Sequence, residues 1–140
     1  MKLKGPALAI MAIFVLWNLL DLVIHVWILG ADYTALVPLI RPVTEMPLWA
    51  INLVLVANDL AFVGLFLLLN AERSPKAAVR YGVLYGLNYG LTVGFGVYGA
   101  VPIPFKVALV WFLGSWVELA LAGLLLAVAL KKPNSATVPV

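Results

Sequence analysis

The sequence predicts an all-α integral membrane protein, a bundle of four helices with both termini in the cytoplasm. Two observations predict this fold class. Hydrophobic residues make up 65% of the 140 residues and charged residues only 11%, against about 25% charged residues in soluble domains. Four apolar runs occupy residues 6–30, 48–69, 77–99 and 103–130, and each is long enough for the ~20 residues that a spanning helix needs. Residues 1–140 therefore form a single transmembrane domain.

The first apolar run begins like a signal peptide, because Lys2 and Lys4 precede it. No small-residue cleavage site follows, however, and the run continues past Asp21, so we expect a retained membrane anchor. The loop after this run contains three prolines, at positions 38, 42 and 47. Because proline interrupts helices, we expect an ordered turn or a short re-entrant piece here.

The later runs are separated by short breaks. Residues 70–75 end one helix and start the next, and residues 99–104 form a tight turn with two prolines. The two halves resemble each other weakly, since Asp59 lies five residues before Gly64 and Glu118 lies five residues before Gly123. A parallel two-helix repeat about an axis along the membrane normal would explain this spacing.

The basic residues predict the orientation. Seven of them lie at the amino end, in the second loop and at the carboxyl end: Lys2, Lys4, Arg73, Lys76, Arg80, Lys131 and Lys132. An even number of spans places these three regions on one side, and only Arg41 and Lys106 on the other. Because cytoplasmic loops carry the excess of lysine and arginine, we expect a multi-pass protein of a bacterial-type inner (plasma) membrane with both termini inside.

Polar side chains inside the apolar runs are the candidate site. Such residues are costly in lipid and usually face the interior of the bundle. The candidates for binding a ligand or a proton are Asn18, Asp21, His25, Asn52, Asp59, Tyr85, Asn88 and Glu118. We expect them to line an outward-opening polar cavity that binds or transports a small polar ligand or a proton.

Asp21 and His25 are four residues apart, so they can meet on one helix face. The pair could relay protons, orient the imidazole towards a metal, or only fix helix packing. If Asp59 and Glu118 faced each other in a dry interior, one would hold a proton; alternatively, each is bonded to a neighbouring helix. His25, Asp21, Asp59 and Glu118 would together resemble the carboxylate-rich metal sites of helical bundles, but the Glu-x-x-His spacing of those sites is missing. The sequence names no cofactor.

Four glycines recur every four residues in the third run: Gly82, Gly86, Gly90 and Gly94. Such a glycine zipper allows two backbones to approach closely. It predicts either packing within this chain or a homodimer face.

Composition also excludes some functions. The chain has no cysteine, which removes disulfides and thiolate metal sites. It has no Gly-rich phosphate loop and no basic–aromatic pattern, so we expect no nucleic-acid partner. The expected partners are the lipid bilayer and a larger membrane complex or a second copy. Two other functions stay open: an accessory subunit of such a complex, and a membrane enzyme that uses the Asp21–His25 pair as acid and base.

The chain also resembles a group of known sequences. His25, Leu29 and Tyr33, spaced by four, are followed by Arg41-Pro42 and Glu45-Met46. Pro102, Pro104, Trp111, Glu118 and Gly123 complete the pattern. In these features the chain resembles small uncharacterised bacterial membrane proteins with four spans. The resemblance covers most of the chain and implies the architecture, with no activity attached.

Overall fold

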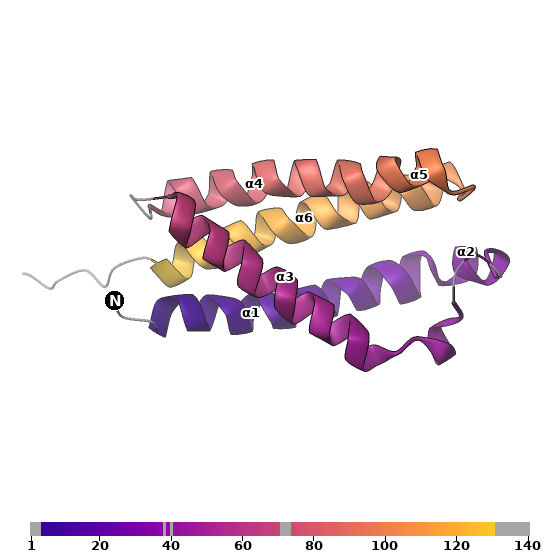
Figure 1. Ribbon diagram of the computed structural model, residues 1–140, viewed down its shortest axis with the longest axis horizontal. Coiled ribbons are helices and arrows are strands. Elements are labelled where there is room, and N and C mark those ends of the chain that lie inside the picture. Colours follow the sequence, from indigo (N-terminus) through magenta and orange to yellow (C-terminus); the bar gives the residue numbers. More distant parts are fainter. Residues whose placement is uncertain (1–3, 38, 40, 71–73, 131–140) are drawn as a thin grey trace, which may run out of the picture.

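A computed structural model describes residues 4–37, 39, 41–70 and 74–130, and these residues form helices and no strands. Three helices run alongside one another: α1 (Lys4–Asp21), α4 (Pro75–Leu91) and α6 (Phe105–Leu130). Helix α3 (Leu48–Leu69) crosses them obliquely (Figure 1). The start of α1, the end of α3, the start of α4 and the end of α6 gather at one end of the bundle. The short helices α2 and α5 lie at the opposite end.

The first helix changes from an α-helix to a π-helix directly after Asp21, between Asp21 and His25. Helix α1 (Lys4–Asp21) continues directly into a π-helix, η1 (Leu22–Ile28). The N–H of Leu29 donates to the carbonyl of Ile24 at 3.0 Å, a bond that spans five residues. Helix α2 (Gly30–Ala35) follows, and a 3₁₀ turn, η2 (Val43–Glu45), leads to the next long helix. The loop is therefore built of short ordered turns.

In the second half of the chain, α4 and α6 form a helical hairpin. Helix α3 (Leu48–Leu69) precedes α4 (Pro75–Leu91), whose first turn is capped by the Ser74 hydroxyl accepting from the N–H of Ala77 at 3.2 Å. Helix α4 runs without a break through a π-helix, η3 (Thr92–Gly96), into α5 (Val97–Ala100). After the two prolines, α6 (Phe105–Leu130) returns along α4.

Three helical stretches among the described residues are long and apolar enough to cross a membrane: Lys4–Ile28, Leu48–Leu69 and Phe105–Leu130. The third run of the sequence corresponds to α4, η3 and α5, in which glycines and tyrosines lower the mean hydropathy. The basic residues Lys2, Arg73, Lys131 and Lys132 lie outside the described residues.

The glycine face of α4 and η3 packs directly on α6. A Cβ atom added to Gly82 would lie 2.5 Å from the carbonyl oxygen of Leu119 and 2.8 Å from the Cα of Gly123. The same atom on Gly90 would lie 2.6 Å from the carbonyl oxygen of Phe112. Real Cβ contacts are never this short, so the two backbones pack as closely as they do because the side chains are absent.

The buried apolar residues form two separate clusters. One, near the start of α1, contains Ile13, Trp17, Phe62, Phe66 and Leu126. The other contains Leu29, Tyr33, Ile103 and Val107, near α2. The polar part of the bundle lies between the two.

Candidate functional site

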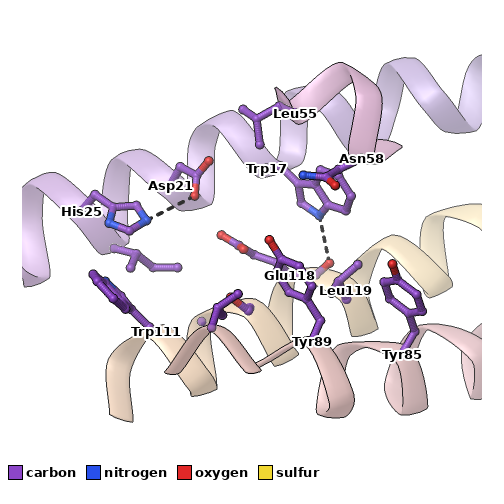
Figure 2. Close-up of a pocket in the computed structure, with 14 residues that line it drawn as sticks. Trp17, Asp21, His25, Leu55, Asn58, Tyr85, Tyr89, Trp111, Glu118 and Leu119 are labelled. Atoms are coloured by element: carbon purple, nitrogen blue, oxygen red, sulfur yellow. Dashed lines mark hydrogen bonds and ion pairs between the residues drawn. The ribbon is translucent and has the colours of Figure 1, made fainter. Parts of the chain in front are cut away.

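A cavity of about 230 Å³ lies between α1, η1, α3, α4, η3 and α6 (Figure 2). Its polar lining consists of Asp21, His25, Asn58, Ser115 and Glu118. Four aromatic side chains, Trp17, Tyr85, Tyr89 and Trp111, form much of the remaining wall. The cavity is therefore an aromatic chamber with two carboxylates and one imidazole.

Asp21 and His25 face the cavity from consecutive turns of the first helix. His25 Nε2 lies 3.5 Å from Asp21 Oδ1 (Figure 2). The side chain of His25 is 44% exposed and that of Asp21 is 31% exposed, so neither is fully buried. The imidazole therefore lies in the wall of the cavity with the Asp21 carboxylate beside its Nε2.

Hydrogen bonds connect His25 to Tyr33 and Trp111, which belong to the buried cluster near α2 or pack against it. Trp111 Nε1 donates to the hydroxyl of Tyr33 at 2.7 Å, and the same hydroxyl lies 2.5 Å from His25 Nδ1. Because the indole can only donate, the Tyr33 oxygen accepts from it and its own proton goes to His25 Nδ1. This assignment leaves the ring proton on Nε2, the atom that faces Asp21.

Tyr33 connects the site to α2 and was not among the eight sequence candidates, and neither were Asn58 and Ser115 of the cavity lining. Tyr33 belongs to α2, outside the apolar runs, and it is buried. Burial raises the pKa of Tyr33 to about 12, while the Trp111 hydrogen bond opposes the rise and the charges of Asp21 and Asp32 add to it. The hydroxyl therefore keeps its proton for His25 at physiological pH. In the sequence, only the spacing by four of His25, Leu29 and Tyr33 could have indicated that Tyr33 lies on the same side as His25.

Glu118 enters the cavity from α6. Its carboxylate extends towards the side of Asp21 (Figure 2), and its Oε1 is enclosed and has no hydrogen-bond partner. Its backbone carbonyl accepts from Trp17 Nε1 at 3.3 Å, which joins α6 to α1. An enclosed oxygen without a partner costs about 1–3 kcal/mol, so the position of Glu118 lowers the stability of the fold.

The cavity brings together four of the eight sequence candidates: Asp21, His25, Tyr85 and Glu118. The other four do not line it. Asn18 and Asn52 turn back to their own helices and donate to the carbonyls of Phe14 and Leu48, at 3.0 and 2.9 Å. Asn88 is exposed on α4.

Asp59 occupies a different environment. It is completely buried on the face of α3 that carries Phe62 and Phe66, and neither carboxylate oxygen has a hydrogen-bond partner. It does not line the cavity with Glu118. Helical periodicity could place Asp59 on an inward face, but it could not show whether that face would reach the cavity that Glu118 lines.

The four metal candidates are not assembled as a metal site. Across residues 4–130, apart from the few that the structure does not describe, no group of three or more His, Cys, Asp or Glu side chains could hold a metal ion. Outside the cavity, Lys106 Nζ donates to Asp32 Oδ2 at 2.7 Å. This lysine thus neutralises an acid of α2, as expected for charges at the ends of the spans.

Comparison of the chain with protein-family models, with curated proteins and with solved structures finds no match.

Proposed function

We propose that the protein is a four-span inner-membrane protein whose cavity binds a small cation, as a step in its transport or sensing, and exchanges protons with it. The continuous helix from α4 to α5 supplies the fourth span. With four spans, the basic residues of the termini and of the second loop all face the cytoplasm, in accordance with the positive-inside rule.

The carboxylate of Glu118, in the wall of the cavity, is the observation that carries the proposal. It shares the cavity with the Asp21 carboxylate, and both are suited to accept hydrogen bonds from a cationic donor. The tryptophan and tyrosine rings that surround them attract cations through their faces. A protonated amine fits this combination of acids and aromatic walls, whereas an anion would meet two carboxylates.

The proton part of the proposal rests on His25. The imidazole lies between Asp21 and Tyr33, which places a group that can both accept and donate a proton at the edge of the cavity. A ligand amine could give a proton to this imidazole or take one from it without reaching bulk water.

Ethylammonium, whose N–H groups can donate to a carboxylate, tests the cation-binding step by isothermal titration calorimetry on the detergent-purified protein. Because a hydrogen bond or ion contact to a charged group is worth about 1.5–3 kcal/mol, Glu118→Gln should weaken binding about tenfold or more. Glu45→Gln is the matched control, since it removes an exposed acid of η2. Absence of saturable binding to the wild-type protein, or equal binding by Glu118→Gln, would contradict the proposal.

An accessory-subunit function is the second candidate, and one exposed amide favours it. Asn88 is exposed on α4, outside the cavity, and among the described residues its side chain has no hydrogen-bond partner. An amide that faces lipid is costly, and a helix of another subunit would satisfy it. In this case Asn88→Leu would release a co-purifying membrane partner, whereas Glu118→Gln would retain it.

A further inference from the structure

A second cavity, of about 540 Å³, lies between the end of α3 and the first turns of α4. Asn70, Ser74, Lys76 and Arg80 line its polar part, and Leu84 and Tyr85 line its apolar part. None of the four polar residues belongs to the first cavity. The proposed cation site therefore does not account for this second cavity.

The second cavity changes character along α4. Lys76, Arg80 and Leu84 are spaced by four residues, so they form one stripe on the helix surface. The stripe passes from two cations to an exposed leucine within about 12 Å, at 1.5 Å per residue. Both cations are exposed, and within the described residues neither forms an ion pair.

We propose that this groove binds an anionic phospholipid of the leaflet at the amino end of α4. The phosphate would contact Lys76 and Arg80, because guanidinium and ammonium groups are the usual phosphate ligands. An acyl chain would follow the helix past Leu84. A free phosphate ion would use only the polar part, whereas a phospholipid matches both parts of the groove, as basic pockets beside membrane helices do for lipid head groups.

Native mass spectrometry of the detergent-purified protein tests the proposal. Phosphatidylglycerol should be retained several-fold more than phosphatidylcholine with the same acyl chains, and added inorganic phosphate should not displace it. Lys76→Gln combined with Arg80→Gln should abolish the preference. The control is Arg41→Gln combined with Lys106→Gln, which removes two cations outside the groove and should leave the preference unchanged.

Three results would overturn the lipid site: equal retention of the two lipids, an unchanged preference in the Lys76/Arg80 double variant, or displacement by inorganic phosphate, which would indicate a simple anion site. If the double variant does not fold, the wild-type protein still decides. Exposed charges are screened at high salt, so the preference should fall between about 0.05 and about 0.5 M ammonium acetate. A preference that does not depend on salt would contradict the contact with Lys76 and Arg80.

Discussion

At the scale of single residues, Tyr33 determines how the imidazole of the cavity is held. Its hydroxyl accepts a hydrogen bond from Trp111 and donates one to His25. The ring of Tyr33 also stacks on that of His25, with centroids 5.8 Å apart. One side chain therefore fixes both the tautomer and the orientation of His25.

Tyr33→Phe should lower the stability of the protein by about 1 kcal/mol, because it leaves the partly buried Trp111 N–H without an acceptor. Thermal unfolding in detergent measures this loss. In a nitrogen–proton correlation spectrum, the indole resonance of Trp111 should move, while that of exposed Trp49 should stay in place. An unchanged Trp111 resonance would show that the hydrogen bond does not form in solution.

The stabilisation by Tyr33 should also disappear at alkaline pH. Its pKa is raised from 10.0 to about 12, so folding favours the neutral phenol. The contribution is then complete below pH 10.0 and is lost as the pH rises towards 12. The difference in unfolding temperature between wild type and Tyr33→Phe should shrink over this interval; a constant difference would contradict the role of the phenol proton.

Asp59 gives the opposite prediction, a substitution that stabilises. Because its buried carboxylate has no hydrogen-bond partner, Asp59→Leu should raise the free energy of unfolding by about 1 kcal/mol or more. Asp59→Asn keeps an unpartnered polar group and should gain little. Thermal unfolding of the two variants decides, and a destabilised leucine variant would show that the carboxylate makes a contact that it needs.

At the scale of elements, the α4–α6 pair depends on the missing side chains of its glycines. Gly82→Ala would place a Cβ against the backbone of Leu119 and Gly123, and such overpacking costs about 1–3 kcal/mol. Gly64→Ala in α3 is the control, because nothing lies within 4 Å of its added Cβ. Melting temperatures in detergent should fall for Gly82→Ala and not for Gly64→Ala. Equal melting temperatures would contradict the close packing.

The glycine and Asp–His patterns show what the sequence can predict. Spacings of four residues lie along one helix, so the sequence places Gly82, Gly86, Gly90 and Gly94 on one face and Asp21 beside His25. Contacts between helices depend on crossing angles and π-turns, which periodicity does not encode. For this reason the sequence could not choose α6 as the partner of the glycines, separate Asp59 from Glu118, or bring Tyr33 to Trp111.

At the scale of the whole molecule, the helices predict which parts of the chain share a side of the membrane. Three helical stretches of the described residues meet the requirements for a span, and α4 to α5 is the proposed fourth. With three spans the two termini would lie on opposite sides, whereas with four spans they would lie on the same side. The position of the carboxyl terminus therefore decides between the two arrangements.

Single-cysteine variants can locate that terminus, because the chain has no cysteine of its own. In intact cells, a membrane-impermeant maleimide should label Thr44→Cys in the first loop and should not label Ser135→Cys in the tail. After the cells are lysed, both variants should react. Labelling of Ser135→Cys in intact cells would exclude the four-span arrangement with cytoplasmic termini.

The π-helix η1 has a consequence for the ancestry of the chain. His25 and Tyr33 are eight residues apart, a spacing that an ordinary α-helix would turn about 80° out of line. The wider turns of η1 take up part of this excess, as a one-residue insertion does in other π-helices. In a homologue with one residue fewer between Leu22 and Ile28, this segment would be a regular α-helix. Its histidine would then no longer point towards the tyrosine hydroxyl. The length of this segment in an alignment would then separate descendants that share the chemistry from those that share only the architecture.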